Sequence, residues 1–175
     1  MFKRLLYTFM IIIAIGSIGL GLYRFYEAND THATINTNDV TIEYDGVAQY
    51  ALSSGISSTN YFFFCTAKNN NCQYVLNTLY SDVNNKLKNK RIDDIVEFVD
   101  IQPLIDEGTI ERLSSDWGIN NFPAFISVSN NYGELTINNS LVWDDTNPMG
   151  TIDILNWLAL NGQYDGEILE EVLVP

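Results

Sequence analysis

The chain has 175 residues, and 9 Lys and Arg against 22 Asp and Glu give a formal net charge of −13. This length favours one domain, and 46% hydrophobic residues are enough for a sizeable core. The acidic balance excludes nucleic-acid binding, two cysteines exclude a four-cysteine zinc site, and one histidine leaves neither a Ser-His-Asp triad nor a His-rich metal centre. We therefore expect no metal site and no cofactor.

The N-terminal residues 1–24 predict a membrane anchor. The run 5–23 carries no charge and is long enough to cross a bilayer as a helix. Lys3 and Arg4 precede this run and Arg24 follows it, so the positive-inside rule predicts a cytoplasmic N-terminus and an exported remainder. The alternative is a cleaved signal peptide, whose apolar part is usually shorter and followed by a small-residue cleavage site.

The polar residues 25–39 predict a linker, in which we expect His32 to be solvated. Residues 40–164 then form the predicted globular domain, and residues 165–175 form an acidic C-terminal tail. Because the exported part is strongly acidic, we expect it to be repelled by anionic lipid headgroups.

Hydrophobic periodicity predicts alternating helices and strands in the domain. In chain order these are a helix over 40–54, a strand over 61–65, a helix over 72–87, a strand over 95–101, a helix over 104–117, strands over 122–128 and 134–143, and a final helix. The turn 130–133 predicts a hairpin between the last two strands. Asn147 and Pro148 predict the start of the final helix, as N-cap and first helical residue, and Gly162 its end. The order indicates an α/β domain with a mixed four-stranded sheet and helices on both faces.

Four features stand out in the predicted domain: the aromatic strand YFFFC ending at Cys65, the cysteine Cys72 at a helix start, the strand FVDI, and the segment WGINNFP that ends at Pro123. On these features, the sequence from Val40 to Gly162 resembles the thioredoxin-like family. A hairpin and a final helix complete the match.

The resemblance implies a cis peptide bond between Phe122 and Pro123, in a tight turn that faces the active-site helix. In the family this turn presents backbone groups to a bound peptide or thiol, which makes Phe122 and Pro123 the candidate substrate-binding residues. It also implies thiol–disulfide chemistry at the helix start, where the helix dipole lowers the pKa of a cysteine. Cys72 and Cys65 are therefore the candidate catalytic residues.

The cysteine spacing departs from the family pattern. Six residues separate Cys65 from Cys72, where the family has Cys-x-x-Cys. Counting back from Cys72, Asn69 occupies the position of the nucleophilic cysteine, and Phe63 occupies that of a buried carboxylate which assists proton transfer in many members.

Three interpretations of the cysteines remain open. The pair forms a structural disulfide, as export to an oxidising compartment favours. Alternatively the pair is redox-active in spite of its spacing, with Cys72 attacking a partner. In the third interpretation both thiols are free, and Cys65 is a small buried hydrophobe.

Two functions from different classes follow from these interpretations. The first is a membrane-anchored, extracytoplasmic thiol–disulfide oxidoreductase or accessory factor for exported proteins, similar to thioredoxin-like accessory proteins of bacteriocin export. Its partners are the thiols or disulfides of exported proteins and peptides. The second is a redox-inactive thioredoxin-fold binding module, tethered at the cell surface and stabilised by a structural Cys65–Cys72 disulfide.

Overall fold

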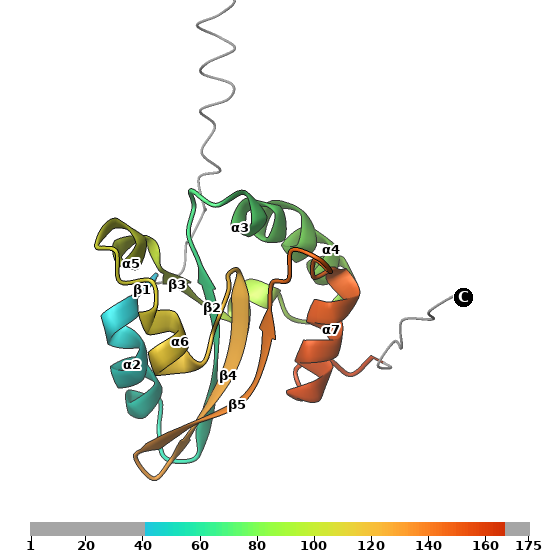
Figure 1. Cartoon of the computed structure of the whole chain (residues 1–175). Helices are drawn as coiled ribbons and strands as arrows, with labels where there is room; N and C mark the ends of the chain where they lie inside the picture. Colours follow the sequence, from blue (N-terminus) through green and yellow to red (C-terminus); the bar gives the residue numbers. More distant parts are fainter. Residues whose placement is uncertain (1–40, 167–175) are drawn as a thin grey trace, which may run out of the picture. The chain divides into compact units, whose positions relative to one another are not determined.

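The computed structural model describes residues 41–166, which form a five-stranded sheet between two layers of helices (Figure 1). The strands are β1 (Ile42–Glu43), β2 (Ser58–Cys65), β3 (Glu97–Asp100), β4 (Ala124–Asn131) and β5 (Glu134–Val142). The helices are α2 (Val47–Ser53), α3 (Asn70–Tyr74), α4 (Tyr80–Lys86), α5 (Gln102–Asp106), α6 (Arg112–Trp117) and α7 (Thr151–Leu160).

The sheet is mixed, with the strand order β1-β3-β2-β4-β5. The first three strands in this order run parallel, while β4 lies antiparallel to both β2 and β5. Parallel neighbours need a crossover, which α2 and the helical segment 70–86 provide, whereas β4 and β5 are joined by a tight turn. The predicted fold class is therefore confirmed, but the sheet has five strands and not four.

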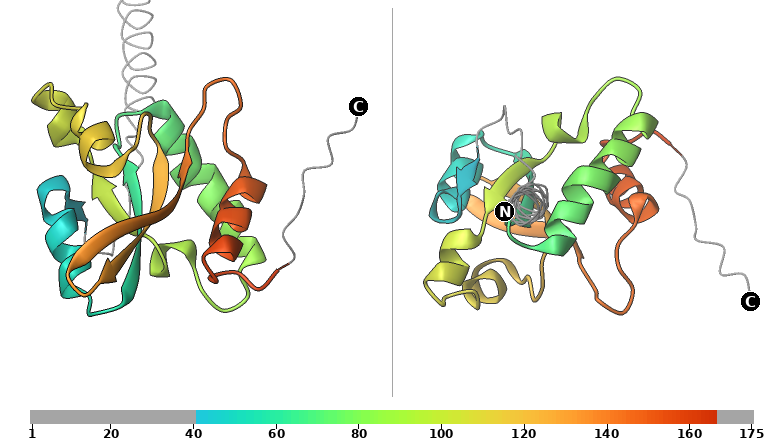
Figure 2. Two further views of the ribbon diagram at one scale, coloured as in Figure 1. Left: turned by 60° about the horizontal axis from the view of Figure 1, so that its bottom comes forward. Right: turned by 90° about the horizontal axis from the view of Figure 1, so that it is seen from above.

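Alternating side chains of the central strands supply both cores of the domain. Phe63 and Cys65 point to the side of α3, α4 and α7, whereas Phe62 and Phe64 point to the side of α2, α5 and α6. All four residues are fully buried. A strand covered on both faces is a continuous apolar run, which explains the sequence YFFFC. Figure 2 shows the two helical layers on opposite faces of the sheet.

The predicted helix over 72–87 is a continuous helical segment over 70–86 with an unusual centre. Residues Val75–Leu79 form a π-helical stretch, and the backbone N–H of Tyr80 donates to the carbonyl of Val75. This wider turn brings the consecutive residues Leu79 and Tyr80 both into the core.

The structure corrects three predicted elements. The predicted helix over 40–54 begins as strand β1, a two-residue edge strand whose partner Val99 is distant in sequence. The predicted helix over 104–117 is two helices, because Gly108 adopts a positive φ of 69° between them. The final helix begins at Thr151 rather than at Pro148, because the Asp153 carboxylate accepts the backbone N–H of Gly150 at 2.7 Å and caps the helix there.

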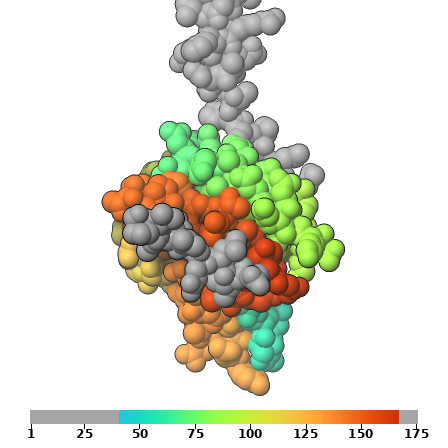
Figure 3. Space-filling model, turned by 90° about the vertical axis from the view of Figure 1, so that its right-hand side faces the viewer, coloured from blue at the N-terminus to red at the C-terminus, as the bar shows by residue number. Residues whose placement is uncertain are grey.

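The β4–β5 hairpin lies at the lower end of the domain in Figure 3, beside the turn between α2 and β2, whose Leu52 and Gly55 carbonyls accept from Nδ2 of Asn130. Tyr132 and Gly133 in its turn have positive φ values of 55° and 95°, which is the backbone of a two-residue hairpin turn. The predicted hairpin is thus confirmed.

The predicted anchor 5–23, the linker 25–39 with His32, and all but the first two residues of the tail 165–175 lie outside the described residues. Among residues 41–166, the structure contains no helix long and apolar enough to span a membrane.

Candidate functional site

The two cysteines form a disulfide that joins the end of β2 to the start of the helical segment 70–86. The Cα atoms of Cys65 and Cys72 are 5.7 Å apart, within the usual range for a disulfide. Both residues have an exposed fraction of 0%, so the bond lies inside the core beside Val75. This arrangement excludes the interpretation in which both thiols are free.

Asn69 begins the helical segment as its N-cap. Its backbone is extended, and its Oδ1 accepts the backbone N–H of Cys72 at 3.0 Å. Asparagine is one of the preferred N-cap residues because it satisfies an N–H group without a partner in the first turn. The residue that occupies the position of the family's nucleophile therefore has a structural role here.

Thr66 provides a second contact to the disulfide, which sequence reasoning missed. Its backbone N–H donates to the Cys72 sulfur at 3.3 Å, and its hydroxyl donates to Oε1 of Gln102 at 2.6 Å. The sequence carries no signal for this contact, because it depends on the turn of the loop after β2.

The peptide bond between Phe122 and Pro123 is cis, in agreement with the resemblance. In the β2–β4 ladder Phe64 pairs with Ala124, so Pro123 comes next to Cys65 when the register is continued by one residue. On the other side of β2, Cys65 pairs with Asp100 of β3. Cys65, its disulfide partner Cys72 and Pro123 thus lie together at one end of the central strands.

Trp143 and Tyr74 lie at the same end of the sheet. The Trp143 backbone N–H donates to the carbonyl of Pro123 at 2.9 Å, and its carbonyl accepts from Nδ2 of Asn121 at 3.0 Å. The Tyr74 ring packs edge-on against Trp143 and is 45% exposed. Trp143 itself is buried, so the exposed aromatic ring at this end of the sheet is that of Tyr74. No periodicity in the sequence connects α3 with the end of β5.

The acidic pair after Trp143 forms local hydrogen bonds. Asp144 accepts from the hydroxyl and backbone N–H of Thr146, and these bonds lower the pKa of its carboxyl. Asp145 accepts from the indole N–H of Trp143 at 2.8 Å. Among residues 41–166, no group of three His, Cys, Asp or Glu side chains is placed to hold a metal ion.

Comparisons with solved structures match thioredoxins from three organisms. The thioredoxin of Trichomonas vaginalis is 16% identical, with a TM-score of 0.38 over 61% of this chain and 85% of that chain. Plasmodium falciparum thioredoxin is 17% identical, with a TM-score of 0.34 over 57% and 70%, respectively. Malassezia sympodialis thioredoxin is 16% identical, with a TM-score of 0.39 over 73% and 97%. No family model matches the chain, and no curated protein sequence matches it.

The order of elements, together with the mixed sheet and its flanking helices, fits a thioredoxin-like fold.

Proposed function

We propose that this chain is a membrane-anchored, extracytoplasmic thioredoxin-like protein that exchanges disulfides with exported proteins or assists their export. Cys65 and Cys72 form its redox pair, and Phe122 and Pro123 position the partner segment. Two features of the Cys65–Cys72 bond carry this proposal. The bond lies at a helix start, and Cys65 lies opposite the cis proline when the β2–β4 register is continued by one residue. Assistance of bacteriocin export is the specific accessory role that the sequence resemblance favours.

Exchange at this site requires that the loop 66–69 and the first turn of α3 open. A thiolate attacks a sulfur atom directly, and both sulfurs belong to fully buried residues. The loop is held by the bond from Gln73 Nε2 to the carbonyl of Ala67 at 2.7 Å and by the Asn69 cap. Lys68 in the middle of the loop is exposed, so the loop itself lies at the surface.

A second function is favoured by the same burial and by Asn69. A disulfide inaccessible to partner thiols, with the nucleophile position occupied by a helix cap, suits a redox-inactive module that only binds a partner chain at Pro123. In this case the disulfide is structural, and the exposed Tyr74 ring contributes contact area.

A redox titration separates the two functions. The full chain is equilibrated with glutathione buffers of increasing reducing power, and free thiols are trapped and counted. A reversible two-electron couple between the two cysteines, with a reduction potential of about −200 mV, supports exchange. A disulfide that stays oxidised in every buffer contradicts the oxidoreductase function and supports the binding module.

A paired variant makes this test sharper. Asn69→Cys combined with Cys65→Ala restores the Cys-x-x-Cys spacing with Cys72. If wild type is inactive in disulfide reduction and this variant gains activity, the scaffold is competent and only the nucleophile is missing, as the second function requires. Activity of wild type that is lost in Cys72→Ala supports the first.

The proposed location has its own test. If the chain is anchored, the mature protein sediments with membranes and its N-terminal sequence begins near Met1. A mature N-terminus near residue 24 would show that the apolar run is a signal peptide.

A further inference from the structure

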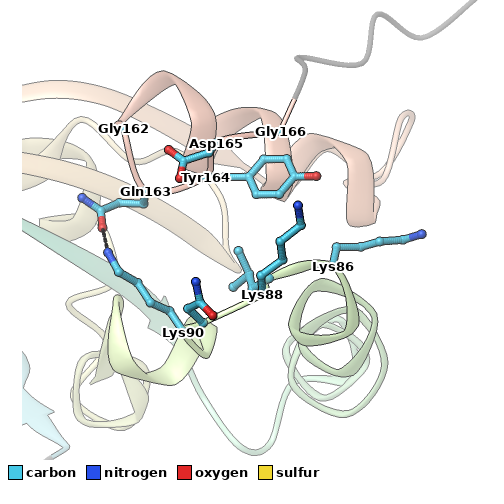
Figure 4. A pocket seen from close by; sticks show the side chains of 10 residues that line it. Lys86, Lys88, Lys90, Gly162, Gln163, Tyr164, Asp165 and Gly166 are labelled. Carbon is cyan, nitrogen blue, oxygen red and sulfur yellow. Dashed lines mark hydrogen bonds between the residues drawn. The ribbon is translucent and has the colours of Figure 1, made fainter.

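A cavity of about 310 Å³ lies between the loop that follows α4 and the residues that follow α7, and neither cysteine lines it. Lys88 and Lys90 line it from the first segment, and Gln163, Tyr164 and Asp165 line it from the second. This volume lies at the lower end of the range typical of small-molecule sites. Figure 4 shows Lys90 reaching Gln163 and Lys88 extending toward the Tyr164 side of the cavity.

Positive charge is concentrated at this cavity in an otherwise acidic domain. Residues 41–166 contain sixteen Asp and Glu but only six Lys and Arg, and four of these six cations lie within residues 86–91. Of the four, Arg91 pairs with Asp93 at 2.9 Å, and Lys86 lies in the last turn of α4, where it complements the helix dipole.

Lys88 and Lys90 have neither of these roles. Both are exposed and follow the helix, and no ion pair within residues 41–166 includes either of them. Lys90 Nζ donates to Oε1 of Gln163 at 3.2 Å, a neutral partner that leaves its charge uncompensated. Asp165 supplies one carboxylate to the lining, so the two ammonium groups leave an excess of positive charge.

We propose that this cavity binds a phosphate group. Two ammonium groups suit a ligand that carries nearly two negative charges near pH 7, as a phosphate monoester does. The hydroxyl of Tyr164, which also lines the cavity, is a further hydrogen-bond donor, whereas Nε2 of Gln163 already donates to the hydroxyl of Tyr61 at 3.2 Å. The phosphate belongs either to a small soluble compound or to the headgroup of an anionic lipid, and the two sources differ in charge and in presentation.

The test uses the full chain in nanodiscs of phosphatidylcholine. In one arm the protein is titrated with inorganic phosphate at constant ionic strength, and binding is followed by the amide NMR shifts of Lys90 and Tyr164. In the other arm the nanodiscs contain phosphatidylglycerol and no phosphate is added. Saturable shifts in the first arm identify a soluble phosphate compound, and shifts in the second alone identify a lipid headgroup.

Matched variants assign the binding to the cavity. Lys88→Gln combined with Lys90→Gln is expected to weaken binding at least tenfold, whereas Lys68→Gln, which removes an exposed lysine from the loop beside the disulfide, leaves it unchanged. Thermal unfolding of both variants checks that the fold is retained. The proposal is overturned if neither arm gives saturable shifts, or if the double variant binds as tightly as wild type. A loss of equal size in Lys68→Gln also overturns it, because binding would then depend only on net charge.

Discussion

Oδ1 of Asn69 accepts the backbone N–H of Cys72 at 3.0 Å, so one asparagine fixes both the start of a helix and the approach of the chain to the disulfide. In the family that the sequence resembles, this position belongs to the nucleophilic cysteine. A substitution at Asn69 therefore changes both the stability of the helix start and the residue that stands at the nucleophile position.

Replacement of this cap should have a measurable cost. We expect Asn69→Ala to lower the free energy of unfolding by about 1 kcal/mol, because the N–H of Cys72 loses its acceptor. Asn69→Asp retains an acceptor and places a negative charge at the helix N-terminus, so it should be neutral or stabilising. Urea denaturation of the oxidised protein measures both, and equal losses in the two variants would contradict the capping role.

Reduction of the Cys65–Cys72 bond should destabilise the domain by about 2–3 kcal/mol, since the bond closes a short loop in the unfolded chain. Urea denaturation with and without a strong reductant measures this difference. In Cys65→Ala combined with Cys72→Ala the reductant should have no effect. An unchanged midpoint in reduced wild type would show that the cross-link does not stabilise the fold.

Asn130 is a buried amide with all of its observed bonds inside the fold. Its Nδ2 donates to the carbonyls of Leu52 and Gly55, both at 3.0 Å, and its Oδ1 accepts the N–H of Gly133 at 2.8 Å. Asn130→Asp removes both donors and turns a carboxylate toward two carbonyl oxygens. We therefore expect a loss of at least about 2 kcal/mol in the free energy of unfolding, measured by urea denaturation.

The neighbouring residue provides the control for this substitution. Asn131 is exposed at the hairpin turn, so Asn131→Asp should change stability by less than about 0.5 kcal/mol. Similar losses in the two variants would mean that added negative charge, and not the buried amide, is responsible.

Tyr50 should make the domain sensitive to alkali. Burial and the hydrogen bond from its hydroxyl to Glu97 raise its pKa from 10.0 to about 12. Between these two values the unfolded tyrosine ionises while the folded one does not, so this contribution to stability is complete below pH 10 and is lost as the pH rises to 12.

Tyr50→Phe tests this dependence. The variant should be less stable at pH 7 but should lose less stability than wild type between pH 10 and pH 12, as followed by urea denaturation at each pH. Part of the slope should remain, because burial and the bond to Asp116 also raise the pKa of Tyr44. An unchanged slope would contradict the role of Tyr50.

Gly118 ends α6 in the left-handed conformation, with φ of 66°, as the cap just before the cis proline segment. We expect Gly118→Ala to cost about 1–2 kcal/mol, because a side chain in this conformation is strained. Gly46→Ala is the matched control, since Gly46 has φ of −86° and an added Cβ would meet Ile42 Cγ2 at an ordinary 3.9 Å. Urea denaturation that shows equal effects would contradict the backbone argument.

Local sequence signals were sufficient where the structure depends on neighbours in the chain. The apolar run of β2 and the hairpin turn at Tyr132–Gly133 each carry their structure in consecutive residues, whereas the cis bond before Pro123 was expected only from the resemblance. The predicted pairing of the two cysteines as one of three alternatives also followed from their placement at a strand end and a helix start.

Elements that depend on distant partners could not be predicted in the same way. Strand β1 has only two residues and exists because it pairs with Val99 and Asp100 of β3. The start of α7 is fixed by Asp153, a competing cap that outweighs the Asn147–Pro148 signal. At the site, the contact of Thr66 with the Cys72 sulfur joins residues whose pairing no periodicity reveals.

The π-helical stretch Val75–Leu79 has a consequence for any comparison that aligns this chain by sequence alone. A π turn holds one residue more than the α-helical turn that it replaces, so all residues from Tyr80 onward are shifted by one position relative to a regular helix that starts at the same cap. An alignment without a gap would equate core positions of α4 with surface positions of a relative. A single-residue deletion within this stretch would give the helical segment 70–86 a regular α-helical register. The stability of this variant would show whether the fold requires the extra residue.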